Sequence, residues 1–380
     1  MARVLLLSPY HGGSHAAFAA GLAAHSRHTF TPLTLPARFW KWRLRGAALL
    51  LADRARRTPR PDVILATDML NLAEFRALSG LADVPCVLYM HENQLCYPLP
   101  SPDRGDAGFG FVNIASALAA RVVIFNSRYH RDAFFGALPG FLQAMPDCPL
   151  PAAPLRRLRE ISRVLPVGCE IEHLRSVAGR DLQSGSAATL PAGAPLILWN
   201  HRWEFDKAPE VFFDVLGRLD DAGRRFRLAL VGENGQVEPK PFLAARERYG
   251  SRVIQFGWLP RRDDYARLLG AADLVISTAR QENFGVSVVE AVACGAWPLL
   301  PRRLAYPEVL PRAWHHACLY RDTDELALRL SGLLQKGLPA PASRAALAAA
   351  MDGYDWSALI GTYDDLLEGV AGGQEPLDAV

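Results

Sequence analysis

The chain has 380 residues, of which half are hydrophobic and 21% are charged, which is the composition of a globular protein with room for two domains. Its formal net charge of +3 is too small for the total alone to indicate a nucleic-acid-binding protein, so only the local distribution of charge can do so. No apolar run is long enough for a membrane span or a signal peptide, and the six cysteines show no CxxC spacing, so we expect reduced thiols and a cytoplasmic protein.

The first 135 residues alternate apolar runs with segments of helical spacing, and this pattern predicts one doubly wound parallel sheet. The expected strands cover residues 3–8, 29–35, 61–66, 85–90 and 121–125, and a basic helix at 155–163 precedes a last strand at 164–168. The carboxyl ends of parallel strands form the edge at which open α/β sheets bind ligands. Polar residues that directly follow these strands are therefore candidates for a site.

Two of these strand ends carry such candidates. Gly12 and Gly13 follow the first strand, and adjacent glycines let the backbone approach a ligand closely. The fourth strand ends in His91, which the polar run Glu92-Asn93-Gln94 follows. Turns use glycine for geometric reasons alone, and a histidine in this position is often a hydrogen-bonded structural group, so both interpretations stay open for each feature.

Between Arg38 and Arg60 there are eight basic residues and one acid, Asp53. Phe39, Trp40 and Trp42 interleave with the first four basic residues, and a helix is expected to follow Arg45 and to end near Arg57. Basic and aromatic side chains together suit contacts with phosphates and stacking on nucleobases. A helix with a solvated basic face and buried tryptophans explains the same pattern.

A linker rich in Ser, Gly, Ala and Pro at 179–195 is expected to contain the domain boundary. We predict a first domain at 1–178, a second at 195–355 and a last helix at 356–370. Expected strands of the second domain cover residues 196–199, 227–231, 253–257, 274–277 and 297–300, with helices at 209–219, 260–271, 287–294, 325–334 and 342–351.

Three strand ends of the second domain carry charged or glycine residues. Arg202 and Lys207 lie at the start of the helix that Pro209 opens, where two cations suit a diphosphate, although both can also be solvated surface groups. Gly232 and Glu233 close the next strand. Glu282 lies in the loop before Gly285, and Glu290 lies in the helix that this glycine opens, whose free N–H groups can hold phosphate. Ordinary helix capping explains the two acids as well.

Taken in chain order, these residues resemble the motifs of the retaining GT4-type nucleotide-sugar glycosyltransferases, which have the GT-B fold. Glu282-Asn-Phe-Gly-Val-Ser-Val-Val-Glu290 resembles their E-x7-E motif. Arg202 and Lys207 are similar to the pair that these enzymes place on the donor diphosphate, Gly12-Gly13 to their glycine loop, and His91 to a histidine facing the donor sugar. The resemblance implies two doubly wound Rossmann-like α/β domains that face each other across a cleft, with the last helix crossing back to the first domain.

Within that family, the chain resembles the tRNA-queuosine alpha-mannosyltransferases over nearly its whole length. The motifs that carry this resemblance are 11–15 (HGGSH), 35–43 (LPARFWKWR), 90–94 (MHENQ), 201–207 (HRWEFDK) and 306–308 (YPE). A long insertion that animal members carry between the domains is replaced by the short linker. The resemblance implies transfer of mannose from GDP-mannose to the cyclopentenediol of queuosine in the anticodon of tRNA-Asp, with no metal cofactor, and we assume a monomer.

The same resemblance implies roles for individual residues. The catalytic residues would be His91, Arg202, Lys207 and Glu282. The donor-binding residues would be Gly12, Gly13, Arg202, Lys207, Gly232, Glu233, Glu282, Asn283, Phe284, Gly285 and Glu290. The acceptor and tRNA-binding residues would be His11, His15, Arg38, Trp40, Lys41, Trp42, Arg43, Arg45, Arg56, Arg57, Glu92, Asn93 and Gln94. Glu282 would accept hydrogen bonds from the donor sugar, and Glu290 from the ribose.

Two alternatives remain open. One keeps a GT4-type glycosyltransferase but gives it another nucleotide sugar and a soluble acceptor other than RNA. The other is a catalytically silent GT-B protein that binds a nucleotide or RNA. A glycosidase with Glu282 and Glu290 as its two carboxylates is rejected, because the neighbouring residues are of phosphate-binding type.

Overall fold

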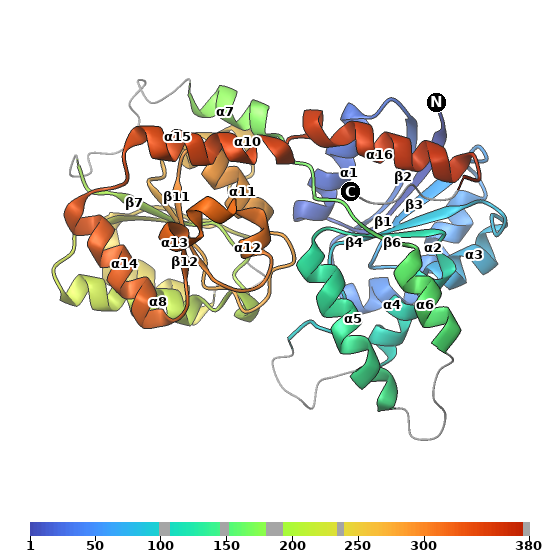
Figure 1. The fold of residues 1–380 in the computed structure, drawn as a ribbon, viewed down its shortest axis with the longest axis horizontal. Helices are drawn as coiled ribbons and strands as arrows, with labels where there is room; N and C mark the ends of the chain where they lie inside the picture. The colour runs from blue at the N-terminus through green and yellow to red at the C-terminus, as the bar shows by residue number, and fades with distance from the viewer. Residues whose placement is uncertain (99–106, 145–151, 180–192, 234–238, 375–380) are drawn as a thin grey trace. The chain divides into compact units, whose positions relative to one another are not determined.

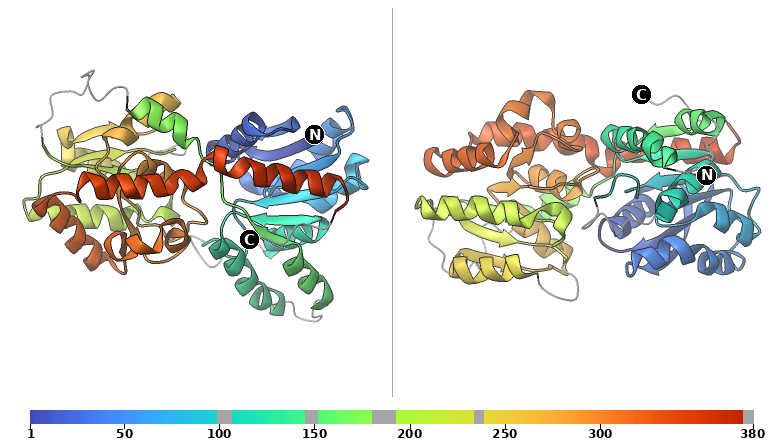
Figure 2. Two further views of the ribbon diagram at one scale, coloured as in Figure 1. Left: turned by 45° about the horizontal axis from the view of Figure 1, so that its top comes forward. Right: turned by 90° about the horizontal axis from the view of Figure 1, so that it is seen from below.

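The computed structural model describes residues 1–98, 107–144, 152–179, 193–233 and 239–374 (Figure 1). The chain divides into two compact units, one of Met1–Gly168 with Trp356–Val380 and the other of Cys169–Asp355. Each unit contains a six-stranded parallel sheet with helices on both of its faces (Figure 2), so the prediction of two doubly wound α/β domains is confirmed. The predicted boundary in the linker falls almost entirely on residues 180–192, which lie outside the described residues.

The sheet of the first unit has the strand order β2-β1-β3-β4-β5-β6. Its strands are β1 (Arg3–His11), β2 (Thr29–Pro36), β3 (Val63–Thr67), β4 (Cys86–Met90), β5 (Val122–Phe125) and β6 (Ser162–Val164). The last strand was predicted at 164–168, and these bounds are wrong, because the strand ends at Val164. Pro166 has no N–H to donate to a neighbouring strand, so the ladder ends with the bond from Leu165 N to Phe125 O at 2.9 Å.

The helices of the first unit cover both faces of this sheet. They are α1 (Gly13–His25), α2 (Trp40–Ala55), α3 (Leu72–Ser79), α4 (Ala107–Ala119), α5 (Arg128–Gln143), α6 (Ala152–Glu160) and α16 (Trp356–Ala371). Ser127 caps α5, because its side chain accepts a hydrogen bond from the N–H of His130. Helix α2 begins at Trp40, so the expectation that the helix begins only after Arg45 is wrong.

Helix α16 completes the core of the first unit from the far end of the sequence, and Figure 1 shows it beside α1. Trp356, the first residue of α16, is almost fully buried. Its indole lies directly against two glycines, since a Cβ atom at Gly21 or Gly168 would come within 2.1 or 2.3 Å of it. The two glycines therefore make the space that the tryptophan fills.

The sheet of the second unit has the order β12-β11-β10-β7-β8-β9. Its strands are β7 (Leu196–Trp199), β8 (Arg227–Leu230), β9 (Val253–Phe256), β10 (Leu274–Ile276), β11 (Trp297–Pro301) and β12 (Leu319–Tyr320). Its helices are α7 (Ile171–Ala178), α8 (Pro209–Asp221), α9 (Lys240–Tyr249), α10 (Arg262–Ala271), α11 (Val286–Ala293), α12 (Tyr306–Val309), α13 (His315–Cys318), α14 (Thr323–Lys336) and α15 (Pro341–Ala349).

Helix α7 was not predicted, and its residues fall within the range 1–178 predicted for the first domain, but it packs against α10 of the second unit. A Cβ atom at Gly270 of α10 would lie 2.8 Å from the Cβ of Ala178, so a glycine allows the two helices to approach closely. No helix of the described residues is long and apolar enough to cross a membrane.

Candidate active site

In the second unit, the loop after β7 is anchored by Trp203. Its indole is 5% exposed and stacks on Phe242 of α9 with ring centroids 4.0 Å apart. The N–H of Trp203 donates to the carbonyl oxygen of Glu233 at 3.1 Å. A Cβ atom at Gly232 would lie 1.8 Å from the carbonyl oxygen of His201, so only glycine allows the loops after β7 and β8 to pack this closely. Gly232 and Glu233, both predicted to bind the donor, thus pack against the loop after β7, which carries Arg202.

The loop then forms a 3-10 turn at Phe205–Lys207 and enters α8. Ala208 has φ +48°, a left-handed conformation that is unfavourable for a residue with a Cβ atom. Thr278 holds this bend, because its hydroxyl donates to the carbonyl oxygens of Lys207 and Ala208 at 2.9 and 3.0 Å. Pro209 opens α8, as predicted.

Lys207 is only 7% exposed and reaches the loop after β10. Its ammonium donates to the carbonyl oxygen of Gln281 at 2.8 Å and to Oε2 of Glu282 at 3.2 Å. Oδ2 of Asp206 lies 3.3 Å from the same nitrogen. The structure therefore brings together Lys207 and Glu282, two residues predicted for the site from motifs far apart in the sequence.

Arg202 contacts the same group of charges from the other side of the turn. Its side chain is 41% exposed and lies 3.3 Å from Oε2 of Glu204. Its Nη2 atom is 4.0 Å from Oδ2 of Asp206, so Arg202 and Lys207 converge on one carboxylate. Sequence reasoning gave Asp206 no role, although the acid stands directly before Lys207.

Glu282 remains ionised beside Lys207. Burial alone would raise the pKa of its carboxyl, but Lys207, His201 and the N–H of Phe284 together bring that pKa below its ordinary value. The N–H of Phe284 lies 3.4 Å from Oε1 of Glu282. An ionised carboxylate with one oxygen toward a lysine can accept hydrogen bonds from the hydroxyls of a sugar.

Gly285 sets the start of α11, as predicted. It has φ +100°, and a Cβ atom there would lie 3.3 Å from the ring of Tyr306. The hydroxyls of Tyr306 and Ser277 are 2.6 Å apart, which fixes the ring behind the glycine. The predicted donor residue Asn283 is 7% exposed, and its Oδ1 accepts a hydrogen bond from Gln281 at 2.9 Å.

Glu290 lies one turn inside α11 and is 5% exposed. Its carboxylate accepts a hydrogen bond from the guanidinium of Arg262 in α10. Asn200 bridges the same region, because its Nδ2 donates to the Tyr265 hydroxyl at 3.0 Å and to the Ser287 carbonyl at 2.8 Å. The Arg262 partner was missed from the sequence, where nothing in the spacing of the two residues connects them.

In the first unit, the glycine turn follows β1. A Cβ atom at Gly12 would lie 2.5 Å from the Cβ of Ala37, and Gly13 has φ +50°, so both positions favour glycine. His11 places its Nδ1 3.1 Å from the Ser8 hydroxyl. His15, in the first turn of α1, lies with its ring centroid 4.2 Å from that of His91.

His91 is held at the end of β4 by its backbone. Asp68, which follows β3, accepts hydrogen bonds from the N–H groups of His91 and Glu92 at 3.1 and 3.2 Å. Asn126 donates to the carbonyl oxygen of His91 at 3.0 Å. Burial, with smaller contributions from His15 and His130, lowers the pKa of His91 well below its ordinary value. The imidazole is therefore neutral at physiological pH.

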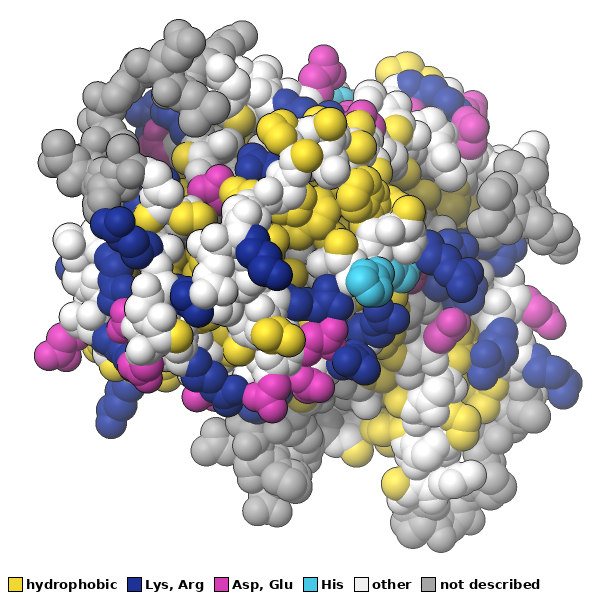
Figure 3. Space-filling model, turned by 60° about the vertical axis from the view of Figure 1, so that its left-hand side comes forward, with side chains coloured by type: hydrophobic (Ala, Val, Ile, Leu, Met, Phe, Trp, Pro, Cys, Tyr) yellow, Lys and Arg dark blue, Asp and Glu magenta, His cyan; other side chains and the backbone are white. Residues whose placement is uncertain are grey.

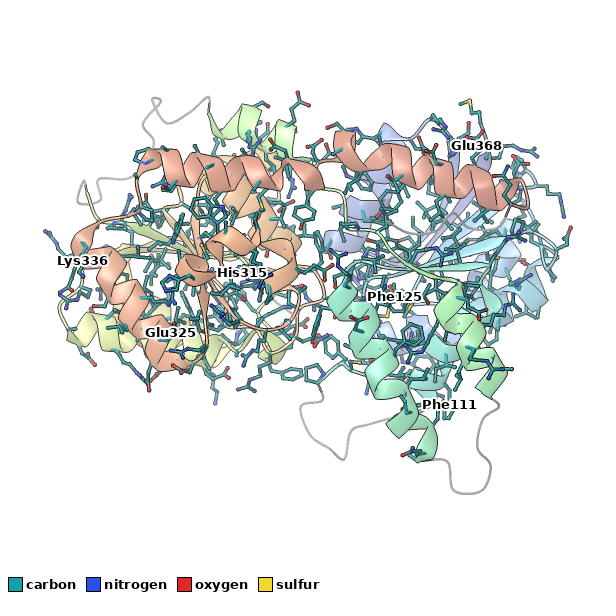
Figure 4. The ribbon with its side chains drawn as sticks, in the orientation of Figure 1. Phe111, Phe125, His315, Glu325, Lys336 and Glu368 are labelled. Atoms are coloured by element: carbon teal, nitrogen blue, oxygen red, sulfur yellow. The ribbon has the colours of Figure 1, made fainter. Side chains whose placement is uncertain are left out.

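Burial also shifts the pKa values of Asp68 and His130 at this edge toward their uncharged forms. Burial and then the charge of Glu92 raise the pKa of Asp68 well above its ordinary value. Burial lowers the pKa of His130 to about 3. The ring of His130 packs edge-on against Phe125, which lies beside α5 (Figure 4), and its Nδ1 is 2.9 Å from Asn126.

The polar run after His91 contributes mainly to its own turn. Asn93 is 1% exposed, and its Oδ1 accepts hydrogen bonds from the N–H groups of Leu95 and Cys96, both at 3.0 Å. The Gln94 side chain donates to Glu92 at 3.0 Å. The structure thus places Asn93 inside the unit and leaves Glu92 and Gln94 half-buried.

The basic stretch divides into packed and exposed residues. Trp40 packs on Phe109 with ring centroids 5.1 Å apart, whereas Phe39 and Trp42 are 70% and 75% exposed. Lys41 and Arg45 are also exposed, and the Arg45 guanidinium lies 4.9 Å from the Phe109 ring centre. Of the two tryptophans in this stretch, Trp40 is packed, as the alternative interpretation of buried tryptophans predicts, whereas Trp42 is exposed.

The remaining arginines of this stretch have partners of different kinds. Arg43 donates to the carbonyl oxygen of Pro36 at 3.1 Å, and Arg56 donates to that of Leu78. Arg57 pairs with Asp53 at 2.9 Å, and Arg38 is exposed. Figure 3 shows a face of the molecule on which basic and acidic side chains are interspersed. The stretch from Arg38 to Arg60, in contrast, has eight basic residues and a single acid, Asp53.

Within the described ranges, no group of three or more His, Cys, Asp or Glu side chains is arranged to hold a metal ion. The described cysteines are free thiols, three buried and two half-buried. Cys148 lies outside the described residues.

Comparisons with known proteins add a family to this geometry. Residues 3–169 match the family described as tRNA-queuosine alpha-mannosyltransferase N-terminal, and residues 186–342 match the glycosyl transferases group 1. A tRNA-queuosine alpha-mannosyltransferase of Drosophila melanogaster is 34% identical over 335 residues, which cover 86% of this chain and 85% of that protein. A GDP-mannose-dependent alpha-(1-6)-phosphatidylinositol dimannoside mannosyltransferase of Mycobacterium tuberculosis is 32% identical over 265 residues, 67% of this chain and 60% of that protein.

Two solved structures resemble the whole chain. Sucrose-phosphate synthase from Thermosynechococcus elongatus gives a TM-score of 0.70 at 15% identity and covers 98% of this chain and 100% of its own. Anabaena HepE in complex with UDP and glucose gives 0.67 at 20% identity and covers 97% and 100%. At these identities the likeness concerns the fold alone, and it supports the predicted GT-B class of two α/β domains.

Proposed function

The chain belongs to the family of the tRNA-queuosine alpha-mannosyltransferases and is a glycosyltransferase, and from this we propose that it transfers mannose from GDP-mannose to queuosine in the anticodon of tRNA-Asp. The observation that carries the proposal is the convergence of Arg202, Lys207 and Glu282 at one edge of the second sheet. Two cations and one carboxylate are what a sugar joined to a diphosphate requires.

In this proposal, the donor lies at the carboxyl edge of the second sheet. Arg202 and Lys207 neutralise the diphosphate as it leaves, aided by N–H groups at the start of α11 beyond Gly285. Glu282 accepts hydrogen bonds from the sugar hydroxyls. Glu290 accepts hydrogen bonds from the ribose while Arg262 holds its other oxygen in place.

The transfer retains the configuration of the sugar through a front-face displacement. The bond from the anomeric carbon to the phosphate oxygen breaks, and the bond from that carbon to the acceptor hydroxyl oxygen forms on the same face. The proton of the acceptor hydroxyl passes to the departing phosphate oxygen, so the reaction needs no protein nucleophile. The proposal includes no metal cofactor, with Arg202 and Lys207 as the cations at the diphosphate. His91, neutral at physiological pH, can position the sugar or the acceptor by hydrogen bonding without adding charge.

The acceptor is a tRNA that contacts the α2 stretch. Lys41, Arg45 and Trp42 are exposed on α2, where cations can neutralise phosphates and an indole can stack on an unpaired base. The Drosophila relative is named for this acceptor. The free thiols support a reducing compartment, and we propose the cytoplasm.

The experiment that tests the proposal is transfer of radiolabelled mannose from GDP-mannose to tRNA with and without queuosine at the wobble position. We expect label only on queuosine-containing tRNA-Asp and no label with the Glu282→Ala variant. Hydrolysis of GDP-mannose without label on any tRNA would reject the RNA acceptor and favour a glycosyltransferase with another acceptor. Failure of GDP, UDP and their sugars to raise the melting temperature would favour a catalytically silent protein.

A further inference from the structure

Asp206 is a buried carboxylate within the charged group of the second unit. None of its side chain is exposed, and its Oδ2 lies 3.3 Å from Nζ of Lys207 and 4.0 Å from Nη2 of Arg202. Across the described part of the chain, no group donates a hydrogen bond to either of its carboxylate oxygens. A buried carboxylate without hydrogen bonds is unfavourable unless opposite charges neutralise it, so the two cations explain why Asp206 can be buried.

Glu204 provides a contrast on the same arginine. It lies 3.3 Å from Arg202, but its side chain is 46% exposed, whereas that of Asp206 is fully buried. Ion pairs between exposed side chains contribute little and exchange readily with other ions in solution. An incoming anion can therefore displace Glu204 from Arg202, whereas it cannot reach the position of Asp206.

We propose that Asp206 is a positioning residue of the donor site, the fixed counter-charge that holds Arg202 and Lys207 side by side before a diphosphate binds. This inference rests on the proposed function, because it takes the diphosphate of a nucleotide sugar as the ligand of the two cations. Asp206 itself does not touch the ligand. It acts through the two cations that do.

The backbone supports a fixed position for this carboxylate. The carbonyl oxygen of Asp206 accepts hydrogen bonds from the N–H groups of Arg280 and Gln281 at 2.7 and 3.3 Å. Asp206 thus joins the loop after β7, which carries both cations, to the loop after β10, which carries Glu282. Without its charge, Arg202 loses its contact with a buried carboxylate but still lies beside the exposed Glu204, and Lys207 still lies beside Glu282 and the Gln281 carbonyl, so the two cations are no longer drawn to one shared group.

The test compares Asp206→Asn with Glu204→Gln, two variants that each remove one negative charge near Arg202. Binding of GDP and of guanosine, each also in the uridine series, is measured for both variants and for the wild type. The ratio of the affinity for the nucleoside diphosphate to the affinity for its nucleoside isolates the contribution of the diphosphate to binding, because the base and ribose are the same. We expect Asp206→Asn to reduce this ratio about tenfold, and Glu204→Gln to leave it unchanged or to raise it up to about fivefold.

Charge repulsion alone predicts the opposite change in this ratio for Asp206→Asn. If the carboxylate acted only by repelling the diphosphate, removing its charge would strengthen GDP binding in both variants. An Asp206→Asn ratio equal to or higher than that of the wild type would therefore overturn the inference. If Asp206 had a purely structural role, Asp206→Asn would lower the affinities for GDP and for guanosine by the same factor. A lower affinity for both ligands with an unchanged ratio would therefore also overturn the inference.

If Asp206→Asn fails to fold, Asp206→Glu carries the test, since it keeps the charge and displaces it by one methylene. We expect at least a threefold lower ratio from that variant, and an unchanged ratio would contradict a positioning role. The wild-type measurement separates this inference from the proposed function. A wild type without preference for a nucleoside diphosphate over its nucleoside would reject the donor assignment itself, whatever the variants do.

Discussion

Each of the two sheets carries polar residues at the carboxyl ends of its strands, but the charges of these residues differ between the two sheets. In the second unit, Lys207 lies between two carboxylates, and Glu282 stays ionised because of it. In the first unit, burial favours the uncharged forms of the groups at this edge, since it lowers the pKa of His91 and His130 and raises that of Asp68. Two parallel sheets with different strand orders therefore also differ in the electrostatics of their carboxyl edges: the edge of the second unit holds buried charges, and that of the first favours uncharged groups.

The difference follows from what surrounds each strand end. His91 lies among aromatic rings, with centroids 4.8 Å from Tyr89 and 5.0 Å from Phe18. Such a medium disfavours charge. Lys207 lies in a loop with carbonyl and carboxylate oxygens around its ammonium, which favour charge. A diphosphate leaving group needs fixed cations, whereas a sugar or a diol needs only hydrogen-bonding groups.

The largest expected effect comes from removing the charge of Lys207. Lys207→Met should reduce mannose transfer by about a thousandfold or more, because the developing charge on the diphosphate then loses a buried cation. The measurement is kcat/KM for transfer, with the melting temperature as a check on folding. Arg218→Met, which removes an exposed cation of α8 that pairs with Asp214 of the same helix and Asp324 of α14, is the matched control. A comparable loss from both variants would contradict the contrast between the two edges.

A second expected effect concerns the exposed cations of the first unit. The pair of changes Lys41→Glu and Arg45→Glu should weaken tRNA binding about a hundredfold at low salt and reduce its dependence on salt concentration. GDP binding should not change. Arg43 and Arg56 are left intact, because they donate to backbone carbonyl groups and their loss would disturb the fold. Equal tRNA affinity in this variant would mean that α2 is not the tRNA surface, and Arg225→Glu serves as the exposed control.

The third expected effect is on stability at acidic pH. Burial lowers the pKa of His130 in the first unit to about 3 and that of His201 in the second to about 4, from an ordinary value of 6.5. Each contributes stability that is fully present above pH 6.5 and is lost as the pH falls toward those values, because the unfolded chain takes up the proton first. The loss is about 1.4 kcal/mol per pH unit for each histidine.

Urea unfolding between pH 7 and pH 5 measures this effect. His130→Gln should flatten the pH dependence of the first unit alone, and His201→Gln that of the second. Asp68, whose pKa is raised, acts in the opposite sense in both the wild type and these variants, so it cancels in the comparison. If both substitutions left the slopes unchanged, burial would not keep these imidazoles neutral.

The smallest expected effect separates two neighbouring tryptophans. Trp42→Ala should weaken tRNA binding about fivefold through lost stacking and leave the melting temperature unchanged, because the side chain is 75% exposed. Trp40→Ala should lower stability by about 2 kcal/mol through lost packing on Phe109. Leu49, 61% exposed on the same helix, is the control, and an equal effect of Leu49→Ala on tRNA binding would indicate a general apolar contact.

Most of the fold could be predicted, because parallel strands read as short apolar runs and glycine marks their turns. The elements that were missed are β12 and the helices α7, α9, α12 and α13, all of ten residues or fewer. β12 has two residues, and α9 is mainly apolar in its first half and mainly charged in its second, without a long apolar face. The start of α2 was misplaced because Phe39, with φ +53°, opens the helix in a conformation that sequence patterns rarely assign to phenylalanine.

The candidate site was predictable where motifs carry it and not where packing alone creates it. Arg202, Lys207 and Glu282 were found from their positions after strands, and the structure brings them together. Arg262 and Asp68 were not found, because they reach the site from neighbouring elements and only their contacts in space reveal them. Asp206 stood within a motif, but its complete burial could not be predicted from the sequence.

The position of Trp356 has a consequence for the synthesis of the chain. The indole fills a space between Gly21 and Gly168 and lies beside Phe18, so the first unit needs a helix that the ribosome makes only after the whole second unit. The second unit, residues 169–355, emerges complete before that helix appears. The nascent first unit must therefore wait with an apolar surface uncovered while the second unit folds, and a chain released too early keeps that surface exposed as a target for chaperones and proteases.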